Sequence, residues 1–272
     1  GFTAATTRKI VFTVPASAPT LYYFCSSHSG MGGQINTNST FGSSNFDGSV
    51  QSLVSSNPTA GFSICKLNPG GNSNITFGHE LGVAPKWVLV KNLVDGATNW
   101  QVFHEGTTAG HKIFLNTTAA RASDSNMWQN TDPTSSVVSM GTAQTTNENV
   151  IAYCWSEIEG FSKFGSYEGN NSADGSVIHL GFRPSFFMAK NIDTTGAWLM
   201  FDSAREPFNL VDLPIEADDA KAEAASGGRE LDFLSNGVKL RGNSSYLNSA
   251  HTFIYMAFAE HPFAGSTPAT AY

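Results

Sequence analysis

The sequence predicts an all-β protein: an antiparallel β-sandwich built from two related halves, preceded by a small β-hairpin segment. Two observations predict it. Short aromatic and β-branched runs alternate with clusters of Gly, Pro, Asn and Asp, a pattern typical of strands joined by turns. A long stretch of the chain also recurs later, with its strand-like runs in the same order. The chain has 272 residues, 40% of them hydrophobic, which is enough for one large β domain or two ordinary ones.

The repeat begins at Gly61 and again at Gly160, and the two copies align without a gap at an offset of 99 residues. The next strand follows at an offset of 98, and each copy closes on a similar apolar strand. The matched positions are glycines, Lys-Asn pairs and tryptophans: Gly61 with Gly160, Gly82 with Gly181, Lys91-Asn92 with Lys190-Asn191, and Trp100 with Trp198. Because no linker separates the copies, we expect one sandwich over residues 60–264, with copies at about 61–159 and 160–263.

Other segments flank this sandwich. Two strand-like runs, "KIVFTV" and "LYYFC", predict a small β segment over residues 1–36. Residues 37–59 are rich in Ser, Asn and Gly and poor in charge, which predicts a linker. Residues 265–272 are expected to form a flexible tail, and the start of the chain, which has neither an initiator Met nor a signal-peptide layout, is expected to be a processed or trimmed end.

Three local patterns predict individual elements. Residues 119–125 and 215–226 are expected to be helical; the second has Pro214 before it and Gly227-Gly228 after it. These two stretches occupy corresponding places in the two copies. "SNG" at 235–237, between two strand-like runs, predicts a two-residue hairpin with a type I′ turn.

Composition excludes several classes of protein. Charged residues make up 14% of the chain, against about 25% in typical soluble domains. The net charge is -7 with no run of Lys or Arg, so nucleic acid is not expected as a partner. No window approaches 18 apolar residues, so a membrane-spanning helix is not expected either. Three cysteines are an odd count, and we expect Cys65 and Cys154 to be buried free thiols rather than parts of a disulfide framework.

Cys25, His28 and Met31, spaced three residues apart behind an aromatic strand, are the candidate metal ligands. A cupredoxin-type copper site uses a thiolate, two imidazoles and a weak axial thioether, and these residues supply three of the four. The second imidazole is missing, because no His occurs among the residues before Cys25. We therefore expect no cofactor, with copper as the alternative and a hairpin loop packed through its own side chains as the simpler interpretation.

The remaining patterns indicate no chemistry. "GHELG" at 78–82 lacks the second His of a zinc-protease helix, and we interpret it as a loop before a strand. The carboxylates near Asp218 lack the spacing of a calcium loop and are expected to be solvated: Glu216, Asp218, Asp219 and Glu223. Trp100 and Trp198 repeat with the copies and are expected in the core. No catalytic constellation is present in the sequence, so we expect no enzyme activity. Trp128 and Tyr246, in turn-rich segments outside the repeated strands, are the candidate glycan contacts.

Four stretches of the sequence carry a resemblance to a known family. "VPASAPTLYYFCSSHSGMGGQI" closely resembles a segment of structural proteins of tailed phages, especially marine phages that infect cyanobacteria, where it forms the end of a cupredoxin-like module. "LGVAPKWVLVKN", "AYCWSEIEGFSKFGSYEGN" and "LGFRPSFFMAKN" look like a phage domain found in virion, tail or fibre proteins.

The resemblance implies a non-enzymatic structural protein located in the virion, as a head-surface decoration, a fibre or a tail-associated component. It implies other virion proteins as partners and a homo-oligomer, for which we expect a trimer. Residues 1–36 would then be a partial cupredoxin-like segment. Two alternatives remain open: an adhesin domain that binds host-surface glycans, and a copper-binding cupredoxin-like protein.

Overall fold

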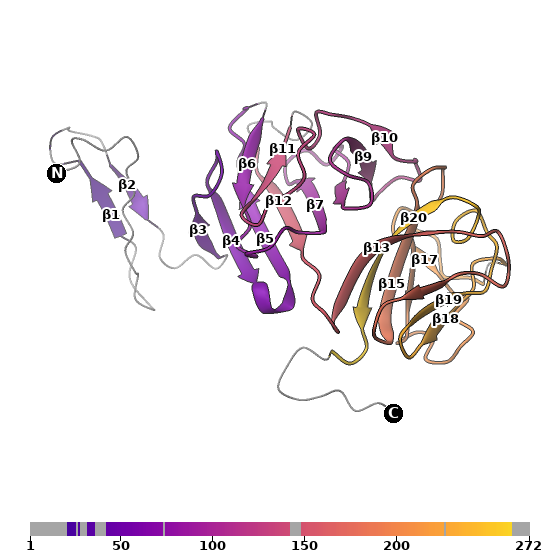
Figure 1. Cartoon of the computed structure of the whole chain (residues 1–272). Coiled ribbons are helices and arrows are strands. Elements are labelled where there is room, and N and C mark those ends of the chain that lie inside the picture. The colour runs from indigo at the N-terminus through magenta and orange to yellow at the C-terminus, as the bar shows by residue number, and fades with distance from the viewer. Residues whose placement is uncertain are drawn as a thin grey trace. The chain divides into compact units, whose positions relative to one another are not determined.

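The computed structural model describes residues 21–25, 27, 32–35, 42–72, 74–141, 148–225 and 227–262, and the chain divides into two units, Gly1–Ser43 and Ser44–Tyr272. In the first unit, strands β1 (Leu21–Phe24) and β2 (Gly32–Ile35) pair antiparallel, with Leu21 opposite Ile35 (Figure 1). A hairpin is present as expected and "LYYF" is one of its strands, but the other strand is Gly32–Ile35, which was not predicted. The run "KIVFTV" and the tail at 265–272 lie outside the described residues.

The first half of the second unit is an eight-stranded antiparallel sheet in the order β10-β9-β8-β7-β12-β5-β4-β3. Its strands are β3 (Ser43–Asn45), β4 (Ser52–Asn57), β5 (Phe62–Leu67), β7 (Trp87–Asn92), β8 (Gln101–His104), β9 (His111–Phe114), β10 (Ala122–Ser123) and β12 (Val150–Trp155). A two-stranded sheet accompanies it, made of β6 (Ile75–Gly78) and β11 (Val137–Met140). The single helical element described is the 3₁₀ turn η1 (Pro58–Ala60), and no described helix is long and apolar enough to cross a membrane.

The second half has the same plan with fewer strands. Its main sheet has the order β13-β20-β15-β16-β17, formed by β13 (Ser162–Glu168), β15 (Pro184–Asn191), β16 (Leu199–Asp202), β17 (Ile215–Glu216) and β20 (Thr252–Ala259). A three-stranded sheet accompanies it, formed by β14 (Val177–His179), β19 (Gly237–Leu240) and β18 (Leu231–Leu234). The order β5-β12-β7-β8 in one half thus matches β13-β20-β15-β16 in the other. The protein is all-β, as predicted.

The repeated residues have repeated backbone roles. Gly61 and Gly160 both have positive φ, 64° and 72°, a conformation that a residue with a Cβ adopts only at a cost. Asn92 and Asn191 are both buried and both close the turn after their strand, since each side-chain oxygen accepts hydrogen bonds from the amides two and three residues on. Glycine and asparagine therefore recur for conformational reasons.

The first strands of the two halves differ in register. Trp155 lies opposite both Trp87 and Phe62, whereas Phe258 lies opposite both Phe186 and Ser162. Phe62 therefore corresponds to Ser162, an offset of 100 rather than the 99 of the ungapped alignment. Because a one-residue slip moves every side chain to the other face of a sheet, the aligned letters on these two strands point to opposite faces.

The core has three parts. One cluster belongs to the first half, around Phe77 and Trp128, and one to the second half, around Phe187 and Phe233. The third contains residues of both halves: Trp87, Leu89, Val102, Ile113, Phe164, Met188, Ile192, Trp198, Ile254 and Met256. In this shared cluster the indoles of Trp87 and Trp198 meet edge to face at 5.6 Å. Of the two repeated tryptophans, Trp198 is fully buried, as expected, whereas Trp100 is only half-buried and packs against this cluster.

Both predicted helices are wrong. Residues 119–125 contain strand β10, and residues 215–226 contain strand β17, where Ile215 pairs with Met200. Tertiary contacts override the helix propensity of residues 215–226. Glu216 binds Arg229, and the Asp218 carboxylate accepts a hydrogen bond from the Trp198 amide, so both contacts hold this segment along the sheet.

Residues 37–59 are not simply a linker, because they contain β3 and β4, and β4 pairs with β5 along its whole length. The hairpin at 235–237 is confirmed, with Leu234 opposite Gly237. Its turn is not type I′, since Ser235 and Asn236 are not among the described residues with positive φ.

Candidate functional site

The predicted metal ligands are only partly described. Cys25 follows β1, is half-buried and forms no disulfide, whereas His28 and Met31 lie outside the described residues. Within the part of the chain that the structure describes, no three His, Cys, Asp or Glu side chains are grouped so as to hold a metal ion. The copper hypothesis for Cys25, His28 and Met31 therefore stays a prediction.

The other two cysteines are free and buried, as expected. Cys65 and Cys154 lie on the neighbouring strands β5 and β12 and contact each other through their thiols. The hydrogen bond with Cys65, together with burial, raises the pKa of the Cys154 thiol well above its usual value. A thiol held neutral in this way is a packing group rather than a nucleophile.

Trp128 is not a glycan contact, which corrects the prediction from the sequence. Its side chain is 1% exposed and packs in the core of the first half, edge to face with Phe103 at 5.9 Å. A sugar stacks on an open ring face, and this indole has none. The turn-rich sequence around Trp128 forms irregular structure as expected, but that turn lies over the core and points the ring inward.

Tyr246 is half-buried and already has a cation over its ring. The Arg229 guanidinium carbon lies 4.3 Å from the ring centroid, a cation–π contact. The ring also lies against Gly196, where an added Cβ would come within 2.8 Å of Tyr246 Cδ1. Solvent-exposed aromatics are found elsewhere among the described residues: Tyr22, Tyr23, Phe46 and Phe208, of which Phe208 is 81% exposed.

A groove of about 680 Å³ lies where β13 begins. Its lining residues come from the turn before β13, from β13 itself, from the end of β14 and from the segment after β14: Glu157, Glu159, Gly160, Ser162, Lys163, His179, Leu180, Gly181 and Phe182. Two carboxylates, one ammonium group and one imidazole thus border a concave surface whose floor includes the buried side chains of Leu180 and Phe182.

Part of the groove's polar chemistry is used by the backbone. The Glu157 carboxylate accepts the amide of Phe164 at 3.4 Å, and the Ser162 hydroxyl accepts the amide of Ile158 at 3.1 Å. Both acceptors therefore lie along the outer edge of β13. Neither Glu157 nor Ser162 is predicted from the sequence to be a site residue; the signal available was the charged turn "SEIEG", which leads into the repeated Gly-Phe-Ser.

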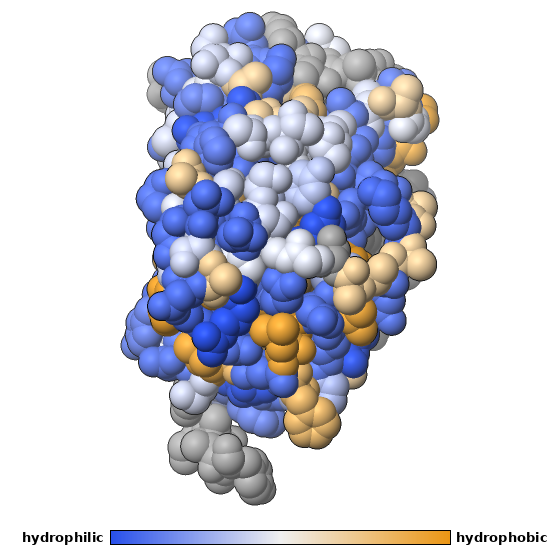
Figure 2. Space-filling model, turned by 90° about the vertical axis from the view of Figure 1, so that its right-hand side faces the viewer, coloured by the Kyte–Doolittle hydropathy of each residue, from blue (hydrophilic) through white to orange (hydrophobic). Residues whose placement is uncertain are grey.

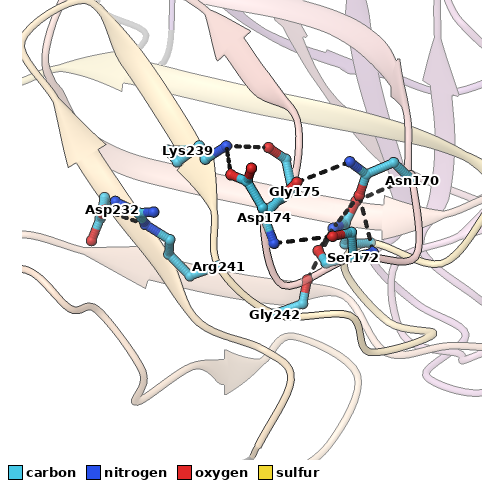
Figure 3. Close-up of polar contacts among 9 residues, drawn as sticks. Asn170, Ser172, Asp174, Gly175, Asp232, Lys239, Arg241 and Gly242 are labelled. Carbon is cyan, nitrogen blue, oxygen red and sulfur yellow. Dashed lines mark hydrogen bonds and ion pairs between the residues drawn. The ribbon is translucent and has the colours of Figure 1, made fainter.

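A second polar cluster ties the loop after β13 to the accompanying sheet (Figure 3). Lys239 donates to the Asp174 carboxylate and to the Gly175 carbonyl, each at 2.6 Å. The bond from Lys239 lowers the pKa of the exposed Asp174 carboxyl. Asn170 accepts the amide of Ser172 and donates to the carbonyl of Asp174. These side chains bond one another and the backbone, so the cluster shapes a loop.

Three buried or largely buried ionisable side chains, those of Lys190, His104 and His79, form hydrogen bonds with backbone carbonyl groups. Lys190 is fully buried; its ammonium group donates to the Asn191 carbonyl at 2.6 Å, and burial lowers its pKa to about 8. The His104 ring accepts the Gly106 amide at Nδ1, so Nε2 carries the proton and donates it to the Tyr255 carbonyl at 3.2 Å. Burial lowers the pKa of His104 to about 4. His79 is arranged in the same way, accepting the Leu81 amide and facing the Thr134 carbonyl.

Fold and site together define a duplicated, antiparallel β-sandwich protein whose two halves share a core. Residues 36–262 match the family described as a domain of unknown function (DUF7483), and the chain belongs to that family. No curated protein and no solved structure matches the chain.

Proposed function

We propose that this protein is a non-enzymatic structural component of a virion, placed on the head surface, in a fibre or on the tail. The observation that carries the proposal is the use made of its buried polar groups. His104 and Lys190 both bind backbone carbonyls, and the His104 bond to Tyr255 crosses from one half to the other. Imidazole and amino groups often act as bases or nucleophiles in enzymes, whereas these two stabilise the fold by binding backbone carbonyls.

Surface composition supports the same role. On one face the surface is mostly hydrophilic or of intermediate hydropathy, with apolar residues in small groups (Figure 2). Ser, Thr, Asn and Gly provide this coat, since charged residues are 14% of the chain. The phage-like motifs named above support virion localisation, other virion proteins as partners and assembly as a homo-oligomer, with a trimer as the expected state.

The test is to purify particles from the source of the gene on a density gradient and to quantify this chain by mass spectrometry. We expect it to co-sediment with the particles at many copies per particle. A chain that stays in the soluble fraction while other virion proteins sediment contradicts the proposal.

A glycan-binding adhesin is the second candidate, because Phe208 is 81% exposed in the segment between β16 and β17. Stacking on sugars needs such an open ring. Binding on a glycan array that is lost in Phe208→Ala and kept in Tyr246→Ala would support it; an array with no binding would remove it.

A further inference from the structure

The two halves differ at one edge of their sheets. In the first half, β5 pairs with β12 on one side and with β4 on the other. In the second half, β13 holds the place of β5 and pairs with β20, but β13 is the end of its sheet. The first half therefore shows that this edge of the repeated sheet accepts another antiparallel strand.

The direction of each β13 backbone group follows from the ladder. Ala259 donates to the Phe161 carbonyl at 2.8 Å, so alternate residues from Phe161 onward bond β20. The even-numbered residues of β13 consequently direct their amides and carbonyls away from the sheet. Local contacts agree, because the Ser162 amide donates to Ile158 and the Glu168 carbonyl accepts the Ser176 hydroxyl.

Those two contacts occupy the ends of the edge and leave its middle open. Between them, the Phe164 carbonyl and both the amide and the carbonyl of Ser166 have no hydrogen-bond partner among the described residues, and Ser166 is exposed. The Phe164 amide has the long bond to the exposed Glu157 carboxylate, at 3.4 Å. The open window thus runs from Phe164 to Ser166, with Gly165 at its centre.

This window is complementary to itself. If a second β13 pairs antiparallel with Gly165 opposite Gly165, Phe164 of each copy lies opposite Ser166 of the other. Each such pair can exchange two backbone hydrogen bonds, so the two pairs make four once each Phe164 amide exchanges its long bond to Glu157 for one to the partner strand. Gly165 falls on the two-fold axis at a non-hydrogen-bonded position, where strands approach most closely and a side chain would interfere.

The side chains permit this register. Lys163 lies opposite Tyr167, and Ser162 lies opposite Glu168, so no like charges face each other. An exposed strand edge with unpaired backbone groups is a template for pairing with another chain, and two-fold self-pairing is the commonest symmetry of homo-oligomers. We propose that the β13 edge is an interaction surface for a second copy of this chain, forming an antiparallel β13–β13 contact about Gly165.

The inference rests on the backbone geometry and not on the virion role, and it predicts a two-fold dimer in place of the trimer expected for that role. A dimer absent from virions would refute the role and leave the contact intact. The experiment is sedimentation of the full chain over a concentration series, with reductant present because Cys25 is half-buried and not part of a disulfide. Ser166→Pro removes the outward amide without touching the ladder to β20; Ser166→Ala is the matched control.

We expect the unmodified chain and Ser166→Ala to dimerise with the same affinity, and Ser166→Pro to dimerise at least tenfold more weakly. Hydrogen exchange at the Ser166 amide of the unmodified chain gives a second readout that needs no variant: it should slow as the concentration rises. The proposal is overturned by a monomer across the series, by a dimer or trimer that Ser166→Pro leaves unchanged, or by Ser166 exchange that does not depend on concentration.

Discussion

His104 makes the stability of this protein depend on pH between 7 and 5. Its ring is fully buried, with Trp87 edge to face at 5.3 Å, and both ring nitrogens are already used. Nδ1 accepts the Gly106 amide and Nε2 donates to the Tyr255 carbonyl. A second ring proton would therefore point at the Gly106 amide in a site shielded from water, which is why burial lowers the pKa to about 4.

The sign and size of the effect follow from this pKa. Between pH 6.5 and 4 the unfolded chain holds a proton on this imidazole and the folded chain does not, so acidification favours unfolding. Taking 6.5 for the unfolded state and about 4 for the folded state, the free energy of unfolding falls by about 2 kcal/mol from pH 7 to pH 5. Burial also lowers the pKa of His79, which adds a loss of the same sign.

The assay is urea unfolding at pH 7 and pH 5, for the natural chain and for His104→Gln. We expect the variant to be less stable at pH 7, because it breaks the contact between the halves, but to lose about 2 kcal/mol less between the two pH values. The carboxyl groups with lowered pKa, such as Asp193, contribute below this window because their ordinary value is 3.8. Equal losses in both chains would refute the assignment of the pH dependence to His104.

Three further variants test the packing. Trp128→Ala should lower the free energy of unfolding by about 3–5 kcal/mol in calorimetry without a glycan-specific defect, and a stable variant would mean that the ring is not buried. Trp198→Phe should cost about 2–3 kcal/mol, because the indole donates to the Phe114 carbonyl across the shared core; a near-neutral result would argue against that bond. Gly141→Ala should cost about 3 kcal/mol, since a Cβ there would lie 1.6 Å from the Asn126 carbonyl oxygen, whereas Gly96→Ala, with nothing within 4 Å, should change stability by less than about 0.5 kcal/mol.

The sequence predicted what local chemistry determines. Gly61 and Gly160 were recognisable because a backbone with positive φ selects glycine. Asn92 and Asn191 were recognisable because an asparagine side chain closes the equivalent turn in each half. Short aromatic runs between turn residues were sufficient to predict an all-β fold.

What depends on contacts far apart in the chain was not predictable. Residues 215–226 have the composition of a helix, but Arg229 and Trp198 hold them along a sheet. Trp128 lies in a polar turn, and only the tertiary structure shows that the ring points inward. The groove before β13 exists because no described strand pairs with the outer edge of β13, whereas β4 pairs with the equivalent edge of β5. The two copies have similar sequences at these strands, so the sequence did not show this difference.

Because the cluster around Trp87 and Trp198 contains residues of both halves, neither half alone has a complete hydrophobic core. Expressed alone, each repeat would present one side of that cluster to water and would be expected to aggregate. If the chain is divided in the turn at 157–160 and the two pieces are expressed together, they should reassemble into the fold, because each piece covers the exposed part of the shared cluster on the other. A single repeat would need an identical chain to cover the same surface, so the duplicated chain holds within one polypeptide a contact that would otherwise join two.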